Sequence, residues 1–335
     1  MTVYNGEETL DESVASILRQ TFPDFELLIM DDGSTDKTWA MLENFSRKDP
    51  RIKIFRQQKA GNSKGRNTLI EKSSCDLIAN MDADDYSHPE RLKKQHEYMA
   101  SHPDTILVST YAKIIEMNHP GKWRMSTAFE EDILNRWYLS IIPPFIHSSV
   151  MFRKSAFIKA GGYKSEEFPA EDYGLWIRMK KFGKLNTIPE VLVEYRMYPK
   201  GVSVNNYRKQ LALRDEMNFQ NMKELYEKNE IPGVKEAVSL LKPYNLNNHQ
   251  RQVLAKLACL TGCWFVKNNE RTKANTYFKL ALTMDWRRFD AAFNLILGHM
   301  NKAFLISIDR FPLRKKFTGK IFWFSPSGHS NLTPK

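Results

Sequence analysis

The sequence has little cysteine, no long apolar run and no leader-like start. Its three cysteines among 335 residues (Cys75, Cys259 and Cys263) form an odd, sparse set without metal-ligand spacing, which argues against a disulfide framework and predicts a reducing compartment. No apolar stretch approaches the roughly 18–20 residues that a membrane-spanning helix requires. The start, Met1 to Gly6, has neither a charged flank nor an apolar core, so we expect no signal peptide and a cytoplasmic location.

Composition predicts a folded, basic chain. A hydrophobic content of 42% is typical of a globular protein, and the length suggests two domains. The net charge of +11 favours anionic partners such as nucleotides, phospholipid surfaces or nucleic acid. A nucleic-acid role would rest on charge alone because no recognition motif accompanies it, so no nucleic-acid partner is expected.

The most informative stretch is an apolar run, Leu77 to Met81, that ends in the cluster Asp82-Ala83-Asp84-Asp85. In an open α/β sheet, ligands bind beyond the carboxyl ends of the strands. Three crowded carboxylates repel one another unless a cation lies among them, and oxygen ligands suit Mg²⁺ or Mn²⁺. Such a metal would hold nucleotide phosphates. The alternative is a solvated acidic turn that caps the next helix.

Hydrophobic periodicity places that run in a βαβαβ pattern, which implies a mostly parallel sheet. Strands are expected at residues 1–4, 25–30, 52–55 and 77–81, and the first helix is expected to open with a capping box at Thr9 to Glu12. Polar loops then share one sheet edge. There Asp32 could accept from a base N–H and Arg66 could meet a base or phosphate. Asp32-Gly33 is also an ordinary turn pair, and Arg66 an ordinary surface arginine.

Later segments add further strands and a second acidic site. Strands are expected at 106–111, 147–152 and 185–195, with an irregular segment at 116–145 that is typical of a binding loop. Glu171 and Asp172 fall in the first turn of a helix, where the helix dipole favours negative charge. An ionised carboxylate at this position could also act as a general base toward a hydroxyl nucleophile.

Seven motifs in order resemble the family 2 glycosyltransferases over about residues 1–200. They are Thr2-Val3-Tyr4-Asn5, Asp31-Asp32-Gly33-Ser34, Gly65-Arg66-Asn67, Asp82-Ala83-Asp84-Asp85, Met151-Phe152-Arg153, Gly161-Gly162-Tyr163 and Glu171-Asp172. The resemblance implies the GT-A fold, Rossmann-like with helices on both faces of the sheet. It also implies inverting, metal-dependent transfer from a nucleotide-sugar, usually UDP-linked, to a saccharide or lipid-linked hydroxyl acceptor in cell-surface polysaccharide or glycolipid synthesis.

The resemblance also implies a donor site. Thr2 and Tyr4 line the nucleotide pocket, Asp32 reads the uracil, Arg66 lies beside the base and diphosphate, and Asp82 contacts the ribose.

On the reacting side, the resemblance makes Asp84 the ligand of Mg²⁺ or Mn²⁺, with Asp85 flanking it, and makes Asp172 the general base. One in-line displacement then inverts the anomeric centre. A glycoside hydrolase would instead use two carboxylates that flank the bond, without a phosphate metal. The residues expected to shape the acceptor side are Glu171, Trp176 and Arg178.

Two departures from the family pattern stand out. The family's first strand normally precedes the Thr-Val-Tyr segment, whereas this sequence begins there, so we expect a truncated first strand and unpaired sheet edges. The family often has a histidine shortly after the pair corresponding to Tyr195-Arg196, which can complete the metal site, and none follows here. The competing hypothesis is therefore a catalytically degenerate module that binds nucleotide or a partner without turnover.

The C-terminal third is expected to be helical from 206 to 305. Five small or aromatic residues fall at the spacing of one tetratricopeptide repeat, which favours either structural helices or a protein-interaction surface: Gly262, Phe265, Ala274, Phe278 and Ala281. The tail, 306–335, is basic with interleaved aromatics. It is either a solvated tail or a peripheral contact with an anionic membrane, on the inner face of the cell membrane.

Overall fold

The computed structural model describes residues 1–119, 121, 123–126, 145–199, 201–228 and 248–284. The chain forms two compact units, Met1–Asn221 and Met222–Lys335. Each is considered by itself below. Within the described residues no helix is both long and apolar enough to cross a membrane.

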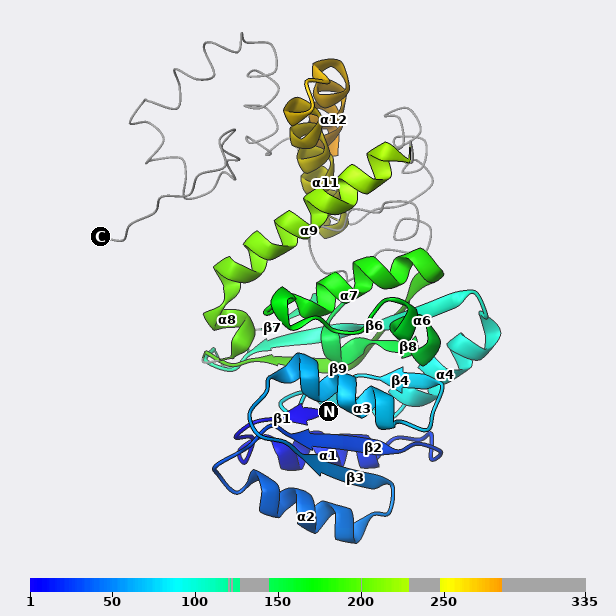
Figure 1. Cartoon of the computed structure of the whole chain (residues 1–335), viewed down its shortest axis with the longest axis vertical. Coiled ribbons are helices and arrows are strands. Elements are labelled where there is room, and N and C mark those ends of the chain that lie inside the picture. The colour runs from blue at the N-terminus through cyan, green and yellow to red at the C-terminus, as the bar shows by residue number, and fades with distance from the viewer. Residues whose placement is uncertain (120, 122, 127–144, 200, 229–247, 285–335) are drawn as a thin grey trace, which may run out of the picture. The chain divides into compact units, whose positions relative to one another are not determined.

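The first sheet is parallel and has helices on both faces (Figure 1). Leu27 and Ile29 of its central strand pack with α1 and α2, whereas Leu28 and Met30 pack against Leu69 of α3. This alternation follows the two-residue repeat of a β-strand. It explains why the central strand reads as a continuous apolar run. In chain order the elements are β1 (Thr2–Val3), α1 (Leu10–Leu18), β2 (Leu27–Asp31), α2 (Thr38–Lys48), β3 (Ile52–Arg56) and α3 (Asn62–Lys72).

The second sheet is mixed, with strand order β4-β8-β6-β9-β5, and β7 pairs with β6. Only β6 and β9 are parallel, and the other pairs are antiparallel. Leu107 and Phe152 face α6 and α7, whereas Val108 and Met151 face α4. Its elements are β4 (Leu77–Ala79), β5 (Tyr86–Ser87), α4 (Arg91–Ser101), β6 (Thr105–Glu116), β7 (Trp123–Ser126), β8 (Met151–Arg153), α6 (Lys154–Lys159), α7 (Glu171–Met179) and β9 (Lys184–Met197).

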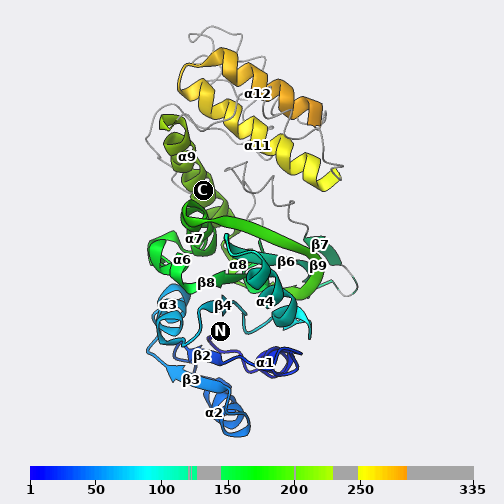
Figure 2. The same ribbon diagram turned by 90° about the vertical axis from the view of Figure 1, so that its right-hand side faces the viewer.

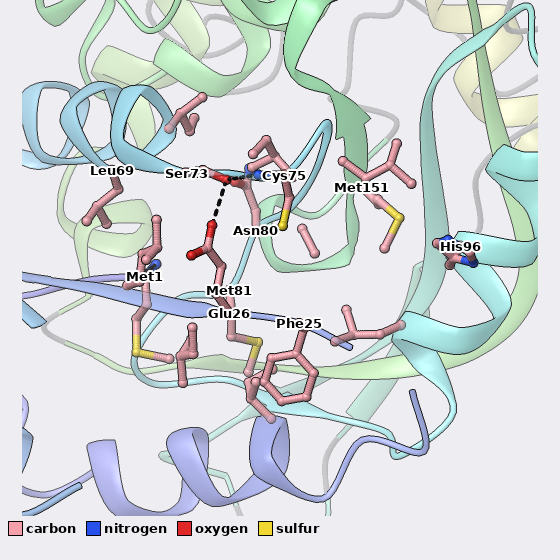
Figure 3. Close-up of a pocket in the computed structure, with 18 of the residues that line it drawn as sticks. Met1, Phe25, Glu26, Leu69, Ser73, Cys75, Asn80, Met81, His96 and Met151 are labelled. Atoms are coloured by element: carbon pink, nitrogen blue, oxygen red, sulfur yellow. Dashed lines mark hydrogen bonds between the residues drawn. The ribbon is translucent and has the colours of Figure 1, made fainter. Parts of the chain in front are cut away.

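A cavity of about 520 Å³ lies between β2 of the first sheet and β4 of the second (Figure 3). The Met1 ammonium faces it and donates to the Leu28 carbonyl, 2.9 Å away. On the other side, Glu26 accepts hydrogen bonds from Ser73 and Ser74 of the segment between α3 and β4. The Glu26 contacts tie the residue before β2 to the segment that leads into β4 of the second sheet, although the sheets share no strand.

Two local expectations fail for physical reasons. Thr9 and Glu12 form no capping box: Thr9 Oγ1 donates to the Ala83 carbonyl, 2.9 Å away, and Glu12 pairs with Arg196. The predicted strand at 147–152 begins only at Met151, because His147–Ser149 forms a 3₁₀ turn. Both departures bring side chains toward the Asp82–Asp85 loop, as the next section describes.

Helix α9 (Tyr207–Glu227) crosses the division between the units. Its first half belongs to the first unit: Gln210 Nε2 donates to the Pro169 carbonyl, and the Tyr173 hydroxyl donates to Asn218. The first compact unit continues to Asn221, whereas the sequence suggests a boundary at 205. The short α8 (Val202–Asn205) precedes this helix.

In the second unit, α11 (Asn248–Lys267) and α12 (Arg271–Met284) form a helical hairpin (Figure 2). Phe265, Ala274, Phe278 and Ala281 are buried in it, so the residues that suggested a tetratricopeptide repeat are packing residues. A Cβ on Gly262 would lie 2.5 Å from the Phe278 ring, so the glycine permits close helix approach. Residues 229–247 and 285–305 of the expected helical region, and the whole tail 306–335, lie outside the described residues.

Candidate active site

The loop after β4 carries the three carboxylates, and each has different partners. Asp82 Oδ1 accepts a hydrogen bond from Arg66 Nη2 at 3.0 Å and lies 3.0 Å from His147 Nδ1. Burial alone would raise the pKa of Asp82. The positive potential and hydrogen bonds of His147 and Arg66 outweigh this effect and hold its pKa well below the ordinary range. Asp82 is therefore a fixed anion.

His147 reaches Asp82 because the 3₁₀ turn before β8 directs it at the loop. A carboxylate only accepts, so Nδ1 carries the hydrogen that faces Asp82. Nε2 lies 2.9 Å from Asn80 Nδ2 and 3.1 Å from the Tyr163 hydroxyl, and Asn80 Nδ2 also donates to that hydroxyl. The imidazole thus connects the carboxylate to a buried polar network.

Asp85 is an anchor rather than an exposed ligand. It is fully buried and accepts hydrogen bonds from the Ser148 hydroxyl and from the Arg196 backbone N–H. Burial, together with the charges of Asp84 and Asp82, raises its pKa well above the ordinary value. This carboxyl ties the loop to β9 through these two hydrogen bonds.

Asp84 is left as the carboxylate with no hydrogen-bond partner from another described residue. Burial and the neighbouring Asp82 charge raise its pKa to about 6. A cation beside it would relieve both effects. Within the described part of the chain no group of three or more His, Cys, Asp or Glu side chains could hold a metal ion.

Arg66 joins this loop to the second acidic site. It projects from α3, and its guanidinium donates to Asp82 and to Glu171 Oε1, each 3.0 Å away. Glu171 opens α7 and is 6% exposed, while the adjacent Asp172 is half-buried. The two acidic motifs, some 90 residues apart in sequence, are thus brought together by one side chain.

Comparison with known proteins identifies the family. A profile described as Glycosyl transferase family 2 matches residues 1–161. The chain is 32% identical over 209 residues to O-antigen biosynthesis glycosyltransferase WbnJ of Escherichia coli, which covers 60% of this chain and 79% of that protein. It is 30% identical over 200 residues to amylovoran biosynthesis glycosyltransferase AmsE of Erwinia amylovora, with coverages of 58% and 74%. The chain belongs to glycosyltransferase family 2.

A solved structure extends the comparison to the fold of this glycosyltransferase. It is the mannosyltransferase PcManGT from Pyrobaculum calidifontis in complex with GDP-Man and Mn²⁺. The TM-score is 0.52 at 14% identity, over 95% of this chain and 81% of that chain. This likeness supports the GT-A fold expected from the sequence.

The residues expected around the base of the nucleotide gather at the ends of β1 and β2. Asp32 is 3% exposed and accepts hydrogen bonds from Gln57 Nε2, Ala60 N and Gly61 N at 2.7, 2.8 and 2.9 Å. In this glycosyltransferase Asp32 therefore holds the loop after β3. Gly33 has φ of 81° and lies against that loop, where a Cβ would be 3.1 Å from the Lys59 amide nitrogen.

Thr2 and Tyr4 differ in exposure. Thr2 is 7% exposed and packs beside Gly65 at the start of α3, whereas Tyr4 is 41% exposed with Lys59 Nζ 3.7 Å from its ring centroid. Of these two residues, Tyr4 is thus the one whose side chain reaches the surface. It lies beside the loop that Asp32 holds.

Trp176 and Arg178 pack behind α7. Trp176 is 2% exposed and lies among Phe152, Tyr163 and His147. The Arg178 guanidinium donates to the Ala160 and Gly162 carbonyls and pairs with Glu167. Any influence of these two residues on an acceptor is therefore indirect, through the position of α7.

Sequence reasoning missed His147, Asn80 and Tyr163. Asn80 and His147 fall within the expected strands 77–81 and 147–152, and Tyr163 falls in the motif Gly161-Gly162-Tyr163. One signal was available: a histidine and an asparagine interrupt two segments predicted to be buried, and buried polar side chains require partners.

Proposed function

We propose that this glycosyltransferase moves a sugar from a nucleotide-sugar to a hydroxyl acceptor by one inverting displacement, with Asp172 as the general base. The observation that carries the proposal is the double ion pair of Arg66. Through it the α7 carboxylates lie beside the Asp82–Asp85 loop, where a donor diphosphate would be held. A base and a leaving-group site are thereby adjacent, as an in-line transfer requires.

The neighbouring acidic residues support the choice of Asp172 over Glu171. Glu171 is buried and its charge is neutralised by Arg66, so it is a poor proton acceptor. Asp172 is half-buried at the same helix end and is accessible to an acceptor hydroxyl. General-base assistance of this kind contributes typically about 10²–10⁴-fold to a rate.

On the donor side, we propose that Asp82 contacts the ribose and that Tyr4, Thr2 and Asp32 form the base pocket. Two carboxylate oxygens offer about four acceptor positions, and three at Asp32 are taken by the loop after β3. One position remains for a base N–H, which suits the imide of uracil. UDP is therefore the proposed nucleotide, and GDP, which the mannosyltransferase structure contains, is the competitor to test.

Asp84 is the proposed protein ligand of Mn²⁺ or Mg²⁺. The donor set fits these ions because they are commonly held by one or two carboxylates together with substrate phosphates and waters. When bound, the ion would offset charge on the departing diphosphate.

The acceptor is proposed to be a saccharide or a lipid-linked saccharide in polysaccharide synthesis. The support is that the relatives named above take part in amylovoran and O-antigen biosynthesis by name. A peripheral membrane contact through the basic tail rests on sequence alone. Liposome co-sedimentation tests it, because deletion of residues 310–335 should abolish binding to anionic vesicles.

The decisive experiment measures nucleotide release from UDP-, GDP- and dTDP-sugars with Mn²⁺. Wild type is compared with Asp84→Ala and Asp172→Asn. We expect metal-dependent release from one donor, with Asp84→Ala weakened in donor binding and Asp172→Asn weakened in turnover alone. Failure of the folded wild-type chain to bind any nucleotide would favour the alternative, a degenerate partner-binding module.

A further inference from the structure

Arg66 makes contacts that differ from those of a nucleotide-binding arginine. Its side chain is 13% exposed, and both outer nitrogens of the guanidinium are engaged: Nη1 with Glu171 and Nη2 with Asp82, each at 3.0 Å. The Tyr163 ring centroid is 5.6 Å from its Cζ. The Arg66 guanidinium therefore contacts protein groups on three sides.

The two carboxylates that Arg66 holds belong to different parts of the site. Asp82 lies 16 residues from Arg66 in the sequence, on the Asp82–Asp85 loop (the donor loop). Glu171 lies 105 residues from Arg66, at the start of α7. A planar guanidinium fixes direction as well as distance, which a lysine ammonium does not. Arg66 therefore links the start of α7 directly to the Asp82–Asp85 loop, in addition to the packing of Trp176 and Arg178 behind this helix.

Glu171 is the buried carboxylate at the α7 end of this contact. At 6% exposure, burial raises the pKa of its carboxyl, and the Arg66 charge offsets part of that rise. Its position one residue before Asp172 means that a shift of Glu171 moves Asp172 by a similar amount.

We propose that Arg66 and Glu171 are positioning residues, which fix Asp172 against the donor loop, and that Arg66 acts through these two ion pairs rather than by binding nucleotide. This inference rests on the proposed role of Asp172. It reassigns Arg66 from the base and diphosphate, and Glu171 from the acceptor. Misplacement of a reacting group by about 1 Å can cost on the order of 100-fold in rate.

The test compares Glu171→Gln with Glu167→Gln. The first removes the charge that faces Arg66 and leaves the Asp82 pair intact. The second is a matched control, because Glu167 forms a similarly buried ion pair with Arg178, a residue of α7. The Glu167 side chain is 14% exposed and the Arg178 side chain 19%. We expect Glu171→Gln to lower kcat about 10- to 100-fold with the nucleotide Kd unchanged within twofold, whereas Glu167→Gln lowers the Tm but keeps kcat within twofold.

Two further variants keep the test independent of folding. Arg66→Lys retains a positive charge but cannot form two directed pairs, so kcat should fall as in Glu171→Gln. In Arg66→Lys/Glu171→Gln the two losses should not add, because both break one bridge. A wild-type kcat in Glu171→Gln, or equal losses of kcat in Glu171→Gln and Glu167→Gln, would contradict the proposal that the Arg66 ion pairs position Asp172. Retained turnover in Asp172→Asn would instead reject the proposed base.

Discussion

Replacement of His147 should destabilise the first unit and weaken donor binding, because its two ring nitrogens serve two different partners. Nδ1 faces Asp82 at 3.0 Å, and Nε2 faces Asn80 at 2.9 Å. An asparagine at this position retains a donor near the place of Nδ1, whereas a glutamine retains an acceptor near the place of Nε2. A phenylalanine retains the ring and loses both.

The expected magnitudes follow from these contacts. A hydrogen bond to a charged group contributes about 1.5–3 kcal/mol, and a neutral one about 1 kcal/mol. Asp82 keeps its Arg66 pair and Asn80 keeps its Tyr163 contact, so neither group is left wholly unsatisfied. We therefore expect losses in unfolding free energy of about 1 kcal/mol for His147→Asn, about 2 for His147→Gln and about 3 for His147→Phe.

Urea denaturation measures the free energies of unfolding. Isothermal titration with UDP measures the nucleotide affinity, to which the proposed contact of Asp82 with the ribose contributes. The affinity should be retained in His147→Asn and reduced about 3- to 10-fold in the other two variants, on the estimate that orienting one charged hydrogen bond is worth about 1 kcal/mol. His96→Phe is the control, because His96 only stacks on Phe22, with ring centroids 4.6 Å apart. A loss in His147→Asn as large as that in His147→Phe would refute the separate roles of the two nitrogens.

Three further predictions concern the rest of the fold. Burial raises the pKa of Glu26, but hydrogen bonds from Lys53 and Ser74 outweigh it and lower the pKa from 4.5 to about 2. Glu26→Gln should therefore cost about 1–2 kcal/mol in urea denaturation at pH 7, and this difference should disappear as the pH falls from 4.5 to about 2; a cost independent of pH would contradict it. Asp32→Ala should leave three donors of the loop after β3 without an acceptor and cost about 2–3 kcal/mol, with faster hydrogen exchange at residues 57–61 as its signature. Gly262→Val should drive a side chain into Phe278 and destabilise the α11–α12 hairpin by about 1–3 kcal/mol in thermal melts, and an unchanged Tm would refute that packing.

The first unit could be predicted well where local pattern decides structure. The order of strands and helices, with strands near 27–31, 52–56 and 77–79, follows from apolar runs separated by helical periodicity, but β4 pairs antiparallel with β8 in the second sheet rather than joining the expected parallel sheet. Local pattern failed where a side chain has a distant partner. Thr9 satisfies a carbonyl 74 residues away instead of capping its own helix. His147 lies 65 residues from Asp82, and the resulting 3₁₀ turn replaced an expected strand.

The three carboxylates show why composition alone overstated the need for a cation. From the sequence, Asp82, Asp84 and Asp85 repel one another, and a metal among all three is expected. In the structure Arg66 and His147 contact Asp82, while Asp85 is buried and accepts hydrogen bonds from Ser148 and from the Arg196 backbone N–H. Asp84 has no hydrogen-bond partner from another described residue, and burial together with the Asp82 charge raises its pKa to about 6. If Asp84 is the protein ligand, as proposed above, most of the coordination of the ion comes from the diphosphate and water. Metal affinity should consequently be weak in the free enzyme and strong only with nucleotide bound. The Mn²⁺ dissociation constants measured by calorimetry with and without UDP should then differ by at least about tenfold. Equal affinities would show that the protein supplies ligands of its own beyond Asp84.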